Sequence, residues 1–177
     1  SQGKYAGVRF QQDTDGDQYM IFIVHDPTLG DVDSFRAIQG RKPMRLPANA
    51  GVMDLVLGNT GALPDDPVIS DNEIDEDWEL TDTTAFSIVF SAAGKLAVRD
   101  VRTTAGSSND DVFNTKTNVD NEVGMFCQDN DADASLVQEP SRKDFVLYDK
   151  KILAEVDSAS RFSGYLQNLK VVYVNSY

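Results

Sequence analysis

The 177-residue chain is strongly acidic, and its charge and composition exclude several classes of function. Its formal net charge is −13 at pH 7, and residues 46–94 contain ten Asp or Glu residues with no Lys or Arg. Because nucleic-acid binding needs a cationic face that neutralises phosphates, we expect no nucleic-acid partner. One cysteine, Cys127, excludes an internal disulfide, and with His25 as the single histidine we find no zinc-ligand cluster.

Length and hydropathy predict one domain with a buried core. A chain of this size, 41% hydrophobic, buries most of the surface that its unfolded form exposes, so we expect residues 1–177 to form one domain. No run reaches the roughly 18 apolar residues of a membrane span. Since the sequence begins at Ser1, without an initiator Met or a signal peptide, we expect a trimmed or processed fragment.

The first half of the chain predicts antiparallel strands. Alternating side chains favour strands over residues 4–11 and 18–25, joined by a polar turn at 12–17. Short extended pieces follow over 35–39 and 43–46, and an apolar strand over 52–57. Residues 63–83 are acidic and contain prolines, so we expect a surface excursion outside the core.

A β-hairpin is predicted over residues 85–100, where two alternating strands meet at a Ser-Ala-Ala-Gly turn. Phe86, Ile88 and Phe90 would share one face of the first strand, and Leu96 and Val98 would continue that face on the second. Gly94 supplies the backbone freedom that the turn needs.

The last third of the chain predicts loops, a strand and short helices. Residues 103–121 and 129–133 favour irregular loops, 145–148 a strand, and 171–174 another strand. Apolar residues at helical spacing predict short helices between about 149 and 168, and only there, with Asp157 as a cap. The fold class is therefore mainly β, a β-rich α+β fold of two antiparallel sheets. We expect the following residues in the core: Phe10, Phe22, Val56, Phe86, Ile88, Phe90, Val98 and Phe145.

Three carboxylates at alternate positions, Asp13, Asp15 and Asp17, are candidate calcium ligands. An EF-hand loop also needs Gly at its sixth position and Glu at its twelfth, and Gln18 and Val24 occupy those places. We therefore favour a solvated hairpin turn, with no required cofactor. The acidic runs 71–77 and 129–133 could also pool oxygen ligands, although a solvated acidic loop is the default.

No enzyme signature is present, so we expect a protein without catalytic residues. Acidic pairs are abundant by composition alone, and none stands out as a general acid and base. The sequence also lacks a Ser/His/Asp order, a Gly-rich phosphate loop and a zinc-ligand spacing.

Residues 86–95 fit the pattern F-S-x-x-F-S-x-x-G-x, which resembles the central hairpin of GspH/FimT-type minor pseudopilins. These are globular heads in type II secretion pseudopili and type IV pili. Residues 1–10 resemble the junction between the long N-terminal helix and the first head strand. Residues 145–150, 165–166 and 172–175 resemble the closing part of bacterial pilin-like proteins that carry prepilin-type cleavage signals.

The resemblance implies a pilin-like head that acts as a non-catalytic structural or assembly subunit. Its partners would be other pilin or pseudopilin subunits or secreted cargo, in the periplasm or outside the cell. The full-length precursor would be anchored in the membrane by a hydrophobic helix. The DNA binding of some FimT-type heads is not implied, because the required basic patch is absent.

Two further hypotheses stay open. In the first, the chain is a secreted ligand-binding β-domain whose acidic loops form a calcium-assisted site for a carbohydrate or another surface ligand. In the second, it is a hydrolase built on carboxylates that the sequence does not single out.

Overall fold

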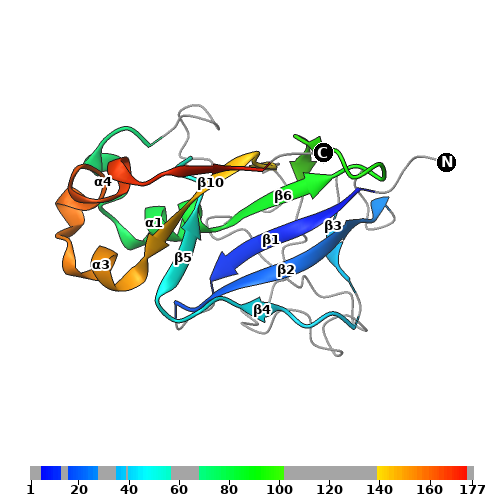
Figure 1. Ribbon diagram of the computed structural model, residues 1–177, viewed down its shortest axis with the longest axis horizontal. Coiled ribbons are helices and arrows are strands. Elements are labelled where there is room, and N and C mark those ends of the chain that lie inside the picture. The colour runs from blue at the N-terminus through cyan, green and yellow to red at the C-terminus, as the bar shows by residue number, and fades with distance from the viewer. Residues whose placement is uncertain are drawn as a thin grey trace.

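A computed structural model describes residues 5–12, 16–27, 35–38, 40–56, 68–101 and 139–174 of the chain. Within them, antiparallel strands dominate, and the longer helices gather at one end of the molecule (Figure 1). The strands are β1 (Ala6–Gln12), β2 (Gln18–His25), β3 (Phe35–Ala37), β4 (Met44–Arg45), β5 (Ala50–Met53), β6 (Phe86–Phe90), β7 (Leu96–Ala97), β8 (Asp100–Val101), β9 (Glu139–Pro140), β10 (Asp144–Asp149) and β11 (Val171–Tyr173). The helical elements are η2 (Asp71–Glu73), α1 (Asp77–Thr84), α3 (Lys150–Glu155), η3 (Ser158–Ser160), α4 (Arg161–Gly164) and η4 (Leu166–Asn168).

Two antiparallel sheets form the framework. The larger has the order β3-β2-β1-β6-β7, with β4 also paired to β2, and the smaller has the order β11-β10-β5. A two-stranded ribbon, β8 with β9, completes the described strands. The prediction of a β-rich fold with two principal antiparallel sheets is confirmed, and the ribbon adds a pairing that the sequence pattern did not predict.

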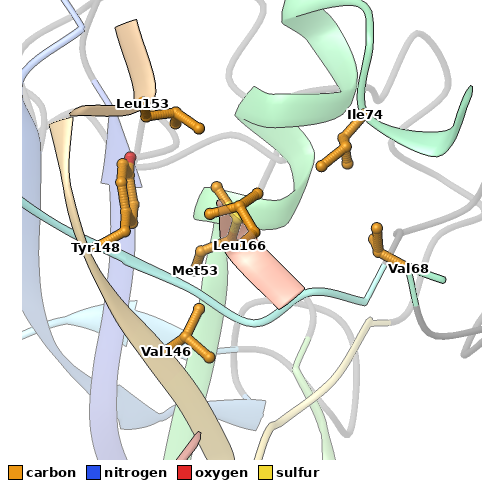
Figure 2. Close-up of a cluster of buried hydrophobic side chains, with 7 residues drawn as sticks. All are labelled: Met53, Val68, Ile74, Val146, Tyr148, Leu153 and Leu166. Atoms are coloured by element: carbon orange, nitrogen blue, oxygen red, sulfur yellow. The ribbon is translucent and has the colours of Figure 1, made fainter. Parts of the chain in front are cut away.

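Side-chain alternation gives the smaller sheet two apolar faces. Val52 and Phe145 belong to a cluster with Phe10 and Phe86 of the larger sheet, in which the Phe10 and Phe86 ring centroids lie 5.0 Å apart. On the opposite face, Figure 2 shows strand residues meeting residues from the helical end of the molecule. This second cluster comprises Met53, Val68, Ile74, Val146, Tyr148, Leu153 and Leu166.

The predicted hairpin is present as β6 and β7. Phe86 and Ile88 are buried, and Phe90 is half-buried. Gly94 has a φ of +74°, and its N–H donates to the Ser91 carbonyl at 2.8 Å, which closes the turn. Gly94 therefore plays the predicted role.

The core list is confirmed for Phe10, Phe86 and Ile88, and wrong for Val98. Val98 is 64% exposed, because β7 ends at Ala97 and no pairing holds the next residue against the core. The four remaining predicted core residues are half-buried: Phe22, Val56, Phe90 and Phe145.

The described part of the acidic segment, 68–83, differs from the predicted surface excursion. It contains η2 and α1, so helices also occur before residue 149. Val68 and Ile74 of this segment are buried and belong to the second cluster. At the start of α1 the Glu79 carboxylate accepts from the Glu76 N–H at 3.0 Å. Acidic residues in the first turn of a helix stabilise it by interacting with the helix dipole. A prediction from apolar periodicity alone does not include this effect, so it missed α1.

The C-terminal elements agree with the prediction of short helices. Asp149 caps α3 by accepting from the Lys151 and Ile152 N–H groups, and Asp157 caps η3 by accepting from the Ala159 N–H. No helix in the described ranges is long and apolar enough to cross a membrane.

Gly7 lies where β1 approaches the backbone of β6, and this contact generates a stability prediction. A Cβ atom at Gly7 would overlap the Ile88 carbonyl oxygen, whereas a Cβ at Gly164 would make an ordinary contact, 3.4 Å from Val156. We expect Gly7→Ala to lower the free energy of unfolding by about 1–3 kcal/mol, because two paired strands must separate to admit the methyl group.

Gly164→Ala in α4 is the matched control and should be neutral or stabilising by up to about 1 kcal/mol. Urea denaturation of both variants gives the comparison. Equal stabilities of Gly7→Ala and the parent chain would show that the strands are not so closely apposed.

Candidate functional site

The predicted calcium turn is only partly within the described residues. Asp13 and Asp15 lie outside them, and Asp17 is in an ion pair with Arg45 of β4. Beside it, the Lys150 ammonium donates to the Gly16 carbonyl at 2.8 Å. Two cationic side chains thus already bind oxygen atoms of this turn, which favours the interpretation as a hairpin turn over a metal-binding loop.

The acidic run 71–77 acts as a clamp on the C-terminal helices. The Asp71 carboxylate accepts from the N–H groups of Phe162 and Ser163, at 2.7 and 2.9 Å, and from the Ser163 hydroxyl at 2.6 Å. The hydroxyl and main-chain hydrogen bonds from Ser163 are the largest causes that lower the pKa of Asp71 below its ordinary value of 3.8. Asp71 therefore holds η2 against α4.

Arg161 completes this clamp from the other side. Its guanidinium donates to the carbonyls of Ile74 and Asp75, both at 3.2 Å, and to the Asp77 carboxylate at 3.0 Å. The carboxylates of Asp71 and Asp77 thus accept hydrogen bonds from residues 84 to 92 positions later in the sequence.

Glu73, in the same run, accepts hydrogen bonds from residues close to it in the sequence. Burial by itself would raise the pKa of Glu73, but hydrogen bonds from the N–H groups of Ile69 and Ser70 and from the Ser70 hydroxyl outweigh burial and lower it. No group of three or more potential metal-ligating side chains occurs in the described ranges. The second acidic run, 129–133, and Cys127 lie outside those ranges.

Asp54 and Arg142 form a buried ion pair. The Arg142 Nε donates to the Asp54 carboxylate at 2.7 Å, and both side chains are buried. His25 ends β2, as its position after an apolar run predicts, and packs between the rings of Tyr5 and Phe35. All three side chains are buried and have partners inside the molecule, as buried polar groups require.

Exposed apolar residues gather instead on the smaller sheet. Val171, Val172 and Tyr173 of β11 are 44%, 36% and 65% exposed, and Leu147 of the neighbouring β10 is 55% exposed. We call these four residues the β11 edge. Single apolar side chains are normal on a surface, but several of them on both faces of a border strand and its neighbour are typical of a sheet edge that another chain can cover.

The geometry of the β11 edge follows from its pairing. Phe145 of β10 lies opposite Val172, and Val146 lies opposite Val171, while β11 has no strand on its other side among the described elements. The edge is therefore the outer border of the smaller sheet (Figure 1). The apolar run at 171–174 predicted the strand, but it could not predict which border of a sheet the strand would form.

No protein-family model, curated protein or solved structure matches this chain.

The Asp71 clamp predicts a pH dependence of stability. Because the hydrogen bonds of the folded state lower the pKa of Asp71, its stabilising contribution is present above the unfolded pKa near 3.8 and is lost as the pH falls through the lowered folded value. In Asp71→Asn, the free energy of unfolding should therefore fall less steeply between about pH 5 and pH 2 than it does in the parent chain.

Urea unfolding over this pH range measures the difference in slope. Glu155→Gln is the control, since this exposed α3 carboxylate accepts no hydrogen bond within the described part of the chain. An unchanged slope in Asp71→Asn would show that the clamp contributes nothing to acid sensitivity.

The 12–17 turn generates a prediction about calcium. We expect millimolar calcium to shift the melting temperature no more than magnesium at the same concentration, and Asp15→Ala to be nearly silent, as substitution of a residue without a ligand or a structural contact is. Thermal unfolding with each cation and with a chelator makes the comparison. A calcium-specific rise in melting temperature that disappears in Asp15→Ala would instead establish a metal site.

Proposed function

We propose that this chain is the globular head of a pilin-like assembly subunit, of the minor pseudopilin type, which acts by contact with neighbouring subunits and has no catalytic role. The β11 edge is the observation that carries this proposal. On a chain with a net charge of −13, four exposed apolar residues on adjoining strands are suited to burial against another protein.

The central hairpin supports the same proposal. The pattern that resembles minor pseudopilins lies on β6 and its turn, between β1 and β7 in the larger sheet. The residues of the pattern therefore serve the core and the turn of a β-rich head. The resemblance of these residues supports the proposed fold of the head, whereas the β11 edge supports the proposed contact with a neighbouring subunit.

A calcium-assisted binding module has less support from the described residues. The carboxylates of Asp17, Asp71 and Asp77 are engaged by Arg45, by the start of α4 and by Arg161. These contacts would have to be broken before the same oxygens could surround a cation.

Substitution at the β11 edge tests the proposed function in the organism that encodes the chain. Deletion of the gene should reduce pilus number or the export of secreted protein, and the wild-type gene should restore it. Leu147→Glu should fail to restore it, because a carboxylate in the contact would be buried without a partner. Since Leu147 is 55% exposed, the variant should fold normally, which its melting temperature checks.

Met44→Glu provides the matched control. Met44 is similarly exposed, at 52%, but lies on β4, on the other principal sheet. If Leu147→Glu restores full activity at normal protein abundance, the β11 edge is not the assembly surface. The coding sequence upstream of Ser1 is an independent check, since the proposal requires a prepilin peptidase site followed by about 20 apolar residues.

A further inference from the structure

The outer side of β11 presents unpaired main-chain groups. The Val174 N–H donates to the Lys143 carbonyl at 2.9 Å, so this pair is hydrogen-bonded, and the Phe145–Val172 pair two residues along repeats the geometry. The intervening residues, Val171 and Tyr173, therefore direct their N–H and C=O groups away from β10. Among the described residues nothing pairs with these two donors and two acceptors.

The opposite border of the same sheet is closed. There the outward-facing groups of Val52 are occupied by Gln18, whose side-chain amide accepts from the Val52 N–H and donates to its carbonyl, both at 2.8 Å. The next outward N–H, of Asp54, donates to the Thr83 carbonyl at 2.9 Å. The Gln18 side chain and α1 thus cover the β5 border, while no described residue pairs with the β11 border.

The side chains of the open border suit an apolar strand. Alternation puts Val171 and Tyr173 on one face and Val172, beside Leu147, on the other, so a strand added to β11 would find apolar partners on both faces. Cross-strand pairs of an aromatic or β-branched residue each stabilise a sheet by roughly 0.2–1 kcal/mol.

Two lysines flank this border. Lys170 directly precedes β11 and Lys143 lies opposite Val174 at its far end; both are exposed, and neither ammonium contacts a carboxylate in the described part of the chain. On an otherwise acidic molecule, this places positive charge at each end of the open strand. A carboxylate opposite Val174 on an added strand would be about two strand spacings, or 10 Å, from the Lys143 backbone, within reach of a Lys–Glu pair.

We propose that β11 accepts, by strand addition, an extended apolar segment of a partner subunit that carries a carboxylate near each end. The segment would pair its main chain with Val171 and Tyr173 and place its carboxylates near Lys170 and Lys143. This inference rests on the proposed function, because it names the mode by which the head contacts its neighbour.

A second copy of this chain fits the border less well. Two copies joined through β11 would each bring a net charge of −13, and they would gather four lysines along one junction. Charge complementarity therefore favours a different subunit with an acidic strand.

Peptide titration against the isotope-labelled full chain tests the proposal. The probe is acetyl-Glu-Thr-Val-Thr-Glu-amide, and the comparison is the same peptide with Lys at both ends. In amide-resolved NMR spectra at physiological salt, we expect saturable shifts at Val171 and Tyr173, with the Glu peptide binding about fivefold tighter than the Lys peptide. Lys170→Glu should remove most of this preference, because the new carboxylate repels the Glu peptide at one end while Lys143 still attracts it at the other.

Proline at an outward position isolates the main-chain contact. Val171→Pro removes one outward N–H and leaves the hydrogen bonds to β10 in place, so the chain should fold and bind the Glu peptide about tenfold more weakly. Val171→Thr keeps the N–H and should bind within about twofold of the parent chain. The melting temperatures of both variants check their folding.

Three results would overturn the inference. Equal binding by Val171→Pro and Val171→Thr would exclude strand addition, and equal or tighter binding of the Lys peptide at these amides would exclude the acidic partner. Concentration-dependent shifts of the same amides without peptide would identify a second copy as the occupant. If Leu147→Glu still abolishes assembly in any of these cases, the proposed function stands while this mode of contact fails.

Discussion

One buried side chain, Gln18, fixes the position of the smaller sheet relative to the larger one. Its amide completes the hydrogen bonding of Val52 on β5 and donates to the Thr84 carbonyl at 2.9 Å, while Gln18 itself begins β2. A buried polar group costs free energy unless it is bonded, so the amide fixes where β5 can lie relative to β2. The aromatic cluster of Phe10 and Phe86 then fills the space between the sheets.

The Asp54–Arg142 ion pair reinforces the same junction. The Arg142 N–H donates to the Ser87 carbonyl on β6, and the Asp54 N–H donates to the Thr83 carbonyl at the end of α1. Loss of one partner of a buried pair typically costs about 3–5 kcal/mol, because the remaining charge is left in a poorly solvating interior. The pair therefore makes the positions of β5, β6 and α1 depend on one another.

This junction determines which border of the smaller sheet is available for contact. Its inner border, β5, is occupied by polar groups from the larger sheet and α1, and its two faces are covered where the apolar clusters form. The clamp of Asp71 and Arg161 holds the acidic run 71–77 against α4, beside that sheet's second apolar cluster. Among the described strands of this sheet, β11 keeps an unpaired border, and the interaction proposed for the head depends on this asymmetry.

Local sequence patterns, alternating side chains or short apolar runs, determined most of the strands. β2 has the predicted bounds, the β6 turn contains Gly94 at positive φ, and Asp157 caps a helix as its position suggested. These features depend on neighbours a few residues apart, so local sequence is sufficient to predict them. The sequence also determined the net charge of −13, on which the prediction of no nucleic-acid partner rests.

Only the tertiary structure decided which polar residues are structural and which strand is open. Ile74 is buried within an acidic run because Asp71 and Arg161 draw that run onto the C-terminal helices, a contact over some ninety residues of sequence. Val98 continues the strand alternation and is nevertheless exposed, since pairing stops one residue before it. Burial depends on contacts between distant segments, and a pattern within one segment cannot specify the partner or the border that it receives.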